Sequence, residues 1–122
     1  MLEGRSVLVV EDEFLIAEML SDMVSDMGMV VCGFADTADN AVMVAAETQP
    51  DVVLMDVRLK GRKDGVDAAL EIYAAKACPI VFITGSREPA TVQRIKNDHP
   101  AALLFKPLNR SALQLVLEKV LQ

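Results

Sequence analysis

The sequence predicts an α/β protein with a doubly wound, five-stranded parallel sheet. Short apolar runs alternate five times with segments of helical spacing along the 122 residues. The central runs are continuous rather than alternating, which is typical of strands buried on both faces of a parallel sheet. Several runs end abruptly at a polar residue, as strands do at the rim of a sheet. We expect one domain spanning residues 1–122.

The first half of the chain contains two strand and helix pairs. Val7–Val10 is the first apolar run and the first strand. A helix begins at Phe14, and its apolar residues recur at helical spacing until Gly28, a natural helix stop. Met29–Phe34 is the second strand. An Asp-Thr pair then offers a cap for a helix over Ala38–Thr48.

The fold is organised around the third strand. Asp51–Asp56 reads Asp-Val-Val-Leu-Met-Asp, with four apolar residues between two acids. A loop with two glycines and four cations follows, and a helix is expected over Val66–Lys76. Ile80–Ile83 is the fourth strand and another unbroken apolar run.

The last elements are a short helix, an edge strand and a terminal helix. Pro89 suits the first turn of the short helix, which ends near Asp98. Ala101–Phe105 is the fifth strand. Either Asn109 or Ser111 can cap the terminal helix, whose apolar residues face inward.

Composition and charge exclude several classes of protein. No apolar run approaches the roughly 20 residues that cross a bilayer, and the start is not a signal peptide, so a cytoplasmic protein without membrane contact is expected. The net charge of −6 argues against direct nucleic-acid binding, because phosphates are held largely by Lys and Arg. Cys32 and Cys78 lack metal-ligand spacing and are expected to be reduced and buried. His99 is expected to be a solvated loop residue.

Five polar residues follow or end the predicted strands, and parallel strands bring them to one edge of the sheet. They are Glu11, Asp12, Asp56, Thr84 and Lys106. Three carboxylates that lie close together repel one another, and hard oxygen ligands of this kind suit Mg²⁺. Taken singly, each residue is more often a helix cap, a turn residue or a solvated charge. Their joint placement favours a functional site.

The chemistry that these residues favour is phosphoryl transfer. A carboxylate at Asp56 can attack a phosphoryl group and form an aspartyl phosphate. A metal ion and the ammonium of Lys106 would neutralise the phosphoryl oxygens. The hydroxyl of Thr84 can hydrogen-bond one of those oxygens, a contact that exists only in the modified state.

Five segments make essentially the whole chain resemble the receiver domain of two-component response regulators. They are Val-Leu-Val-Val-Glu-Asp-Glu, Pro-Asp-Val-Val-Leu-Met-Asp, Asp-Gly-Val-Asp-Ala-Ala, Ile-Val-Phe-Ile-Thr-Gly and Phe-Lys-Pro. The resemblance implies a flavodoxin-like fold with strand order 2-1-3-4-5. It also implies phosphorylation by a histidine kinase or a histidine phosphotransfer protein, with Mg²⁺, and a cis Lys106-Pro107 peptide.

The resemblance assigns a role to each residue of the site. It implies Asp56 as phospho-acceptor, Thr84 as switch hydroxyl, Lys106 as phosphate-contacting cation, and Glu11, Asp12, Asp56 and the backbone carbonyl of Arg58 as Mg²⁺ ligands. The chain is expected to be a signalling phospho-acceptor and not an enzyme, with at most slow self-catalysed phosphorylation and dephosphorylation.

Three positions depart from the family pattern. Leu103 stands where receivers usually carry an aromatic residue whose inward swing reports phosphorylation. The loop from Asp56 to Gly65 lacks the common proline and is one residue longer than usual. Gly85 follows Thr84, where Ala is common. Phe-Ile-Thr-Gly without the aromatic is similar to an atypical receiver subgroup known mainly from alphaproteobacteria.

Two other functions compete with phospho-acceptance. A receiver-like interaction module would act through constitutive contacts, independently of phosphorylation, as Leu103 and the unusual loop suggest. An aspartyl-phosphate hydrolase of the haloacid dehalogenase type also uses Asp, Thr and Lys. That family requires a second Asp two residues after the nucleophile, where this chain has Arg58.

A downstream protein is expected to bind the surface made by the short helix, the fifth strand and the terminal helix. Val92, Ile95 and Leu103 would be partly exposed there, or would pack in the core. The sequence is compatible with a stand-alone receiver and with a piece of a longer protein.

Overall fold

A parallel sheet in the order β2-β1-β3-β4-β5 forms the centre of the computed structural model, which describes residues 2–122. The strands are β1 (Ser6–Val10), β2 (Val30–Ala35), β3 (Val52–Met55), β4 (Ile80–Thr84) and β5 (Ala102–Phe105). The helices are α1 (Phe14–Asp26), α2 (Ala38–Thr48), α3 (Gly65–Ala75), α4 (Pro89–Lys96) and α5 (Arg110–Val120). The predicted doubly wound, flavodoxin-like topology is confirmed.

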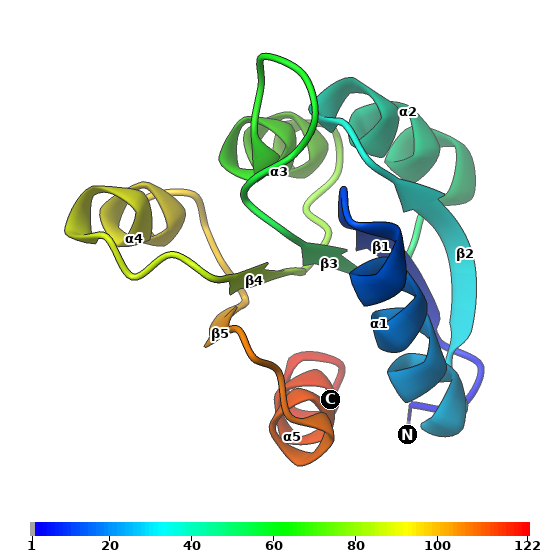
Figure 1. The fold of residues 1–122 in the computed structure, drawn as a ribbon. Coiled ribbons are helices and arrows are strands. Elements are labelled where there is room, and N and C mark those ends of the chain that lie inside the picture. The colour runs from blue at the N-terminus through cyan, green and yellow to red at the C-terminus, as the bar shows by residue number, and fades with distance from the viewer. Residues whose placement is uncertain (1) are drawn as a thin grey trace.

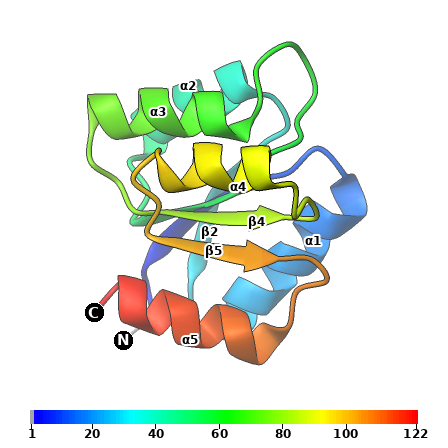
Figure 2. The ribbon, with the colours of Figure 1, turned by 90° about the vertical axis from the view of Figure 1, so that its left-hand side faces the viewer.

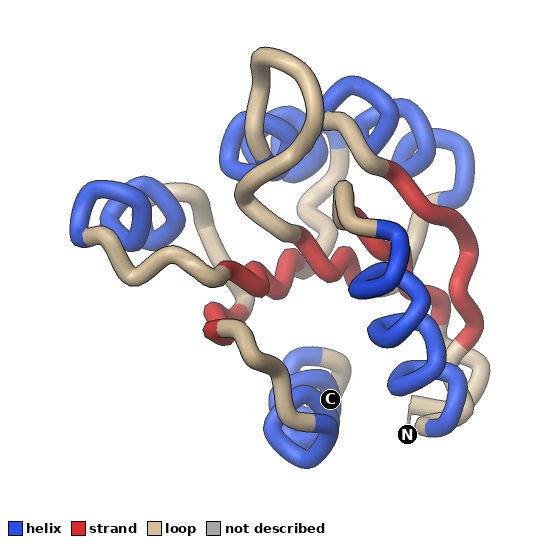
Figure 3. The backbone as a smooth tube through the Cα atoms, viewed as in Figure 1, coloured by secondary structure: helices blue, strands red, loops and turns tan. Residues whose placement is uncertain are grey.

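The helices cover both faces of the sheet. Helices α1 and α5 lie on one face, and α2, α3 and α4 lie on the other (Figures 1 and 3). Every residue of β3 and β4 is buried, whereas β2 and β5, at the edges, are mostly half-buried. The continuous apolar runs of β3 and β4 therefore have the expected cause, which is burial on both sides.

The predicted element boundaries differ from the observed ones by one or two residues. Helix α4 ends at Lys96, and α1 ends at Asp26, two residues before Gly28. The cap of α5 is Asn109, whose side-chain oxygen accepts the amide hydrogen of Ala112 at 3.0 Å. Asn109 rather than Ser111 therefore caps the terminal helix, which begins at Arg110.

Strand β2 is irregular where its sequence contains glycine. Its register against β1 shifts between Val7 and Leu8, so Cys32 forms a bulge. A Cβ atom at Gly33 would lie 2.7 Å from Val44 Cγ1, so the glycine lets α2 pack closely on the strand.

The cysteine prediction is confirmed for Cys78 and only in part for Cys32. Both thiols are free, but Cys32 is half-buried because it lies on an edge strand, where its Sγ contacts Thr48 Oγ1 at 3.4 Å. Burial raises the pKa of the Cys78 thiol to about 11. His99 is exposed as predicted, but its ring also stacks on Tyr73 with centroids 4.8 Å apart.

Of the two placements left open for Ile95, partial exposure or packing in the core, the structure shows the second. Ile95 is fully buried and joins the core beneath α2 and α3, because it is the residue by which the short α4 anchors itself. Val92 and Leu103 are half-buried. Among residues 2–122, no helix combines the length and apolar character needed to cross a membrane.

Candidate functional site

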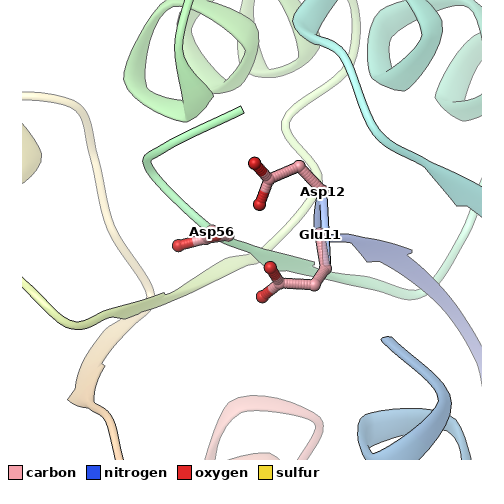
Figure 4. A group of neighbouring side chains, drawn as sticks. All are labelled: Glu11, Asp12 and Asp56. Atoms are coloured by element: carbon pink, nitrogen blue, oxygen red, sulfur yellow. The ribbon is translucent and has the colours of Figure 1, made fainter. Parts of the chain in front are cut away.

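The carboxyl ends of β1 and β3 bring three acidic side chains together. Val10 pairs with Met55 in the sheet, and the amide of Asp56 donates to the carbonyl of Val10 at 3.0 Å. Glu11, which follows Val10, is therefore beside Asp56. One oxygen from each of Glu11, Asp12 and Asp56 lies within 4.8 Å of the others, and the three carboxyl groups project toward a common region (Figure 4).

Two of these acids are buried, which changes their protonation. Glu11 and Asp56 are 4% and 6% exposed. Burial raises the pKa of Glu11 to about 7, and the nearby charge of Asp56 acts in the same direction. Burial also raises the pKa of Asp56. Burial therefore disfavours the charged forms of both acids, and a cation beside them would favour those forms.

Lys106 lies between the two buried acids. Its Nζ is 3.0 Å from Glu11 Oε1 and 3.4 Å from Asp56 Oδ2. Burial lowers the pKa of Lys106, but the hydrogen bond to Glu11 and the charge of Asp56 outweigh it, so the pKa is raised. The lysine follows the end of β5, its amide donates to the carbonyl of Thr84 at 2.8 Å, and its bond to Pro107 is cis, as the resemblance implied.

Thr84 reaches the same cleft from the end of β4. It is 2% exposed, and its Oγ1 accepts the amide hydrogen of Ser86 at 3.1 Å. The cleft has a volume of about 660 Å³ and is lined by 17 residues, which include Asp12, Asp56, Arg58, Thr84 and Lys106. Glu11 is not in the lining but contacts Lys106, which is. The structure therefore brings together all six residues that the sequence singled out.

The start of α3 packs directly against the backbone of Asp56. The amide of Gly65 donates to the carbonyl of Val57 at 2.7 Å. A Cβ atom at Gly65 would overlap the carbonyl oxygen of Asp56. Only glycine permits this approach, so Gly65 helps to position Asp56. Sequence reasoning placed Gly65 in the loop and missed this contact.

A capping box fixes the first turn of α3. Asp64 Oδ1 accepts the amide hydrogens of Val66 and Asp67 at 3.0 and 3.1 Å, and Asp67 Oδ2 accepts the amide hydrogen of Asp64 at 2.9 Å. The Asp-x-x-Asp spacing ahead of an apolar run is the local signal for this motif, and the sequence analysis did not use it.

The cationic loop after Asp56 is fastened to the neighbouring β2–α2 connection. Lys60 lies 3.4 Å from Asp36 Oδ2 and forms an isolated bridge with Thr37. Lys63 lies 3.7 Å from Asp39 Oδ1. These ion pairs are exposed, so they orient the loop more than they stabilise the fold.

The donor set fits a divalent cation. Its three carboxylates supply hard oxygen ligands from two adjacent strands, and the contacting cation, Lys106, offsets one of the three negative charges. Mg²⁺ retains several waters among its ligands, and the open cleft leaves room for them. The carbonyl of Arg58, in the lining of the cleft, is the remaining expected ligand.

Comparison with known proteins agrees with the fold. The model of the response regulator receiver domain matches residues 7–118. The chain belongs to this family. Receiver domains are modules of two-component signalling.

Relatives of this receiver domain include regulators from Mycobacterium tuberculosis and Methylorubrum extorquens. It is 38% identical over 109 residues to the transcriptional regulatory protein PdtaR of Mycobacterium tuberculosis, covering 89% of this chain and 53% of the relative. It is 32% identical to the phyllosphere-induced regulator PhyR of Methylorubrum extorquens, covering 97% and 44%. The chain thus spans about half the length of these relatives.

Solved receiver domains superimpose closely on this one. The signal receiver domain of a modulated diguanylate cyclase from Desulfovibrio desulfuricans has a TM-score of 0.92 at 35% identity, covering 98% of this chain and 94% of the other. The receiver domain of PhyR from Erythrobacter litoralis has a TM-score of 0.86 at 30% identity, covering 98% and 91%.

The structure shows the surroundings of two positions, Leu103 and Gly85, that depart from the usual receiver pattern. Leu103, at the position of the usual aromatic, is half-buried on β5 and pairs with Phe82 of β4. Arg87, in the β4–α4 loop, lies over the ring of Phe105 at 4.1 Å. A Cβ atom at Gly85 would meet open space, so nothing in the surrounding packing requires glycine there.

Proposed function

We propose that this receiver domain accepts a phosphoryl group on Asp56 from a histidine kinase or a histidine phosphotransfer protein. The observation that carries the proposal is the placement of Lys106 between the buried carboxylates of Glu11 and Asp56, with Thr84 in the same cleft. The family assignment supports the same reading. The phosphoryl group would change the charge of the cleft and so bias a two-state element.

The transfer requires a nucleophile and a means of holding the phosphoryl oxygens. A carboxylate oxygen of Asp56 attacks phosphorus as the bond from phosphorus to the donor nitrogen breaks, and the electron pair leaves with the imidazole. Lys106 holds a phosphoryl oxygen with its ammonium, which keeps its protons. Glu11, Asp12, Asp56 and the carbonyl of Arg58 would hold Mg²⁺, whose positive charge would help to neutralise the same oxygens.

Thr84 links the modified aspartate to the β4–α4 loop. Its oxygen accepts the amide hydrogen of Ser86, which leaves the hydroxyl hydrogen to donate to a phosphoryl oxygen. A threonine side chain that turns toward the phosphoryl group moves Ser86 with it. The loop that leads into α4 therefore responds to the state of Asp56.

An apolar surface beside the site suits the phosphodonor protein. Phe14, Leu15 and Met19 of α1 are 75%, 77% and 42% exposed. Helix α1 begins two residues after Asp12, so a protein bound there lies next to the cleft. Large exposed apolar side chains that lie together often mark interaction sites, whereas single ones are common on any protein surface. The surface of α4, β5 and α5 is left for a downstream partner.

The function is tested by incubating the chain with Mg²⁺ and a small acyl phosphate and measuring its intact mass. One added phosphoryl group is expected in the parent and in an Asp22→Asn control, because Asp22 is an exposed residue of α1. Asp56→Asn is expected to gain none. A parent chain without an adduct would contradict the proposal.

A phosphorylation-independent interaction module is the second candidate, favoured by the absence of an aromatic side chain at Leu103. Its signature would be a partner affinity that ignores both the phosphodonor and the Asp56→Asn substitution. A partner whose affinity changes in the parent and not in Asp56→Asn would exclude it.

A further inference from the structure

Arg94 ties α4 to the first turn of α3. Its two terminal nitrogens donate to the two carboxylate oxygens of Asp64 at 2.7 and 3.2 Å, and Nη2 lies 3.5 Å from Asp67 Oδ1. These three side chains form the α3–α4 latch, and α4 lies beside α3 in the fold (Figure 2). Because α3 begins at Gly65, which abuts the carbonyl of Asp56, the latch connects α4 with the backbone of the phospho-acceptor.

Asp98 is a second possible acceptor for the same guanidinium. It lies four residues after Arg94, two residues beyond the end of α4, and the positive charge of Arg94 acts on its carboxyl group. Asp98 is 2% exposed, and neither of its carboxylate oxygens has a hydrogen-bond partner within residues 2–122. The titratable and charged groups around it are Arg94 and His99 from its own segment, and Asp64 and Asp67 from α3. An unpartnered buried carboxylate favours any arrangement that brings it a cation.

An exchange of partners leaves no buried group unsatisfied. The side chains of Asp64 and Asp67 are 29% and 42% exposed, so water can replace the guanidinium there. Asp64 also keeps its bond from the amide of Val66. Only the latched arrangement leaves Asp98 without a partner. The two arrangements differ in the acidic partners of one guanidinium, as expected of a two-state element.

The β4–α4 loop connects the phosphorylation site to α4 and can transmit a movement between them. Thr84 and Ser86 are joined by a hydrogen bond, and α4 begins at Pro89, so a movement of the threonine hydroxyl displaces the start of the helix. The bidentate contact between Arg94 and Asp64 has a narrow geometry and is sensitive to such a displacement. Ile95, which is fully buried, keeps the far end of α4 in place.

We infer that Arg94 is a switch residue whose guanidinium passes from the α3–α4 latch to Asp98 when Asp56 is phosphorylated. The inference rests on the proposed function. In most receivers an aromatic side chain at the position of Leu103 reports phosphorylation. The inference assigns that role to Arg94 in this chain.

The test titrates the full chain, in the presence of Mg²⁺, with beryllofluoride as an analogue of the phosphoryl group. The midpoint is followed by NMR for the parent, Asp98→Asn, Arg94→Gln and the double variant. Asp98→Asn is expected to raise the beryllofluoride concentration at the midpoint roughly fivefold relative to the parent. The same substitution is expected to leave the midpoint unchanged in the Arg94→Gln background. A carboxylate with a merely structural role affects both states equally and leaves the midpoint unchanged.

The possible outcomes separate the switch from the proposed function. Equal midpoints for the parent and Asp98→Asn, or an equal shift in both backgrounds, would overturn the switch alone. A parent that does not respond to beryllofluoride would overturn phospho-acceptance and the switch together. The side-chain Nε–Hε signal of Arg94 gives a direct reading, since it is expected to move on titration of the parent and not of Asp98→Asn.

Discussion

The molecule buries carboxylates in two places and treats them differently. At the edge of the sheet, Glu11 and Asp56 are buried side by side and share the ammonium of Lys106. After α4, Asp98 is buried alone, with no partner for either oxygen among the described residues. Burial raises the pKa at both places, to about 7 for Glu11 and about 6 for Asp98.

The difference indicates what each place is suited to receive. The paired acids open onto a cleft, so they can take a small cation and a phosphoryl group from solution. Asp98 is closed to solvent, and the nearest group that can reach it is a side chain of the protein itself. The first arrangement suits chemistry, and the second suits a change in packing.

The largest expected effect comes from removing the cation of the paired site. Lys106→Met should lower the free energy of unfolding by about 3 kcal/mol at pH 8 without Mg²⁺, because two buried carboxylates lose their ion pair. Chemical denaturation measures the change, with the exposed Lys96→Met as control. If both variants lost the same small amount, the paired site would not depend on its lysine.

The pH dependence of stability distinguishes the paired site by its sign. Since the folded-state pKa of Glu11 is raised from 4.5 to about 7, the folded chain binds more protons than the unfolded chain between these values. Stability is therefore lost as pH rises from 4.5 to 7, by up to about 3 kcal/mol for this group. Unfolding of the metal-free chain at pH 5 and pH 8 should show a smaller loss in Glu11→Gln than in the parent; equal losses would contradict the assignment.

Metal binding should depend on the same carboxylate. Glu11→Gln is expected to weaken Mg²⁺ binding at least about tenfold at pH 8, since it removes a charged oxygen ligand. The parent should bind Mg²⁺ less tightly below pH 7, because protonated Glu11 must release its proton first. Isothermal titration calorimetry measures both effects, with Glu18→Gln on the exposed side of α1 as the matched control.

The smallest expected effect concerns the isolated acid. Asp98→Asn should raise the free energy of unfolding by about 1 kcal/mol at pH 8, because it removes a buried charge that has no partner. The gain should vanish near pH 5, where Asp98, whose pKa is raised to about 6, is already protonated. A variant less stable than the parent at both pH values would show that Asp98 has a partner in the native state.

The sheet and its acidic edge were predictable because both leave local marks in the sequence. Burial on both faces makes β3 and β4 unbroken apolar runs, and strand polarity then brings the residues after Val10 and Met55 to one edge. The capping box of Asp64 and Asp67 had an equally local signal in its spacing.

The rest of the site region depends on packing that the sequence does not display. Arg94 and Asp64 are 30 residues apart, and their contact exists only because α4 lies beside α3. The burial of Ile95 and of Asp98 likewise follows from where the short helix docks, and its single fully buried apolar residue gives little periodicity to read. Long-range contacts between exposed-looking charges are the features that sequence patterns miss.

The fixed ends of the loop after Asp56 have a practical consequence for engineering. The backbone is clamped before the loop by the bond from the Gly65 amide to the carbonyl of Val57, and after it by the cap at Asp64. Between these clamps, residues 60–63 are exposed. A reporter peptide inserted there would lie at the mouth of the cleft and outside the core.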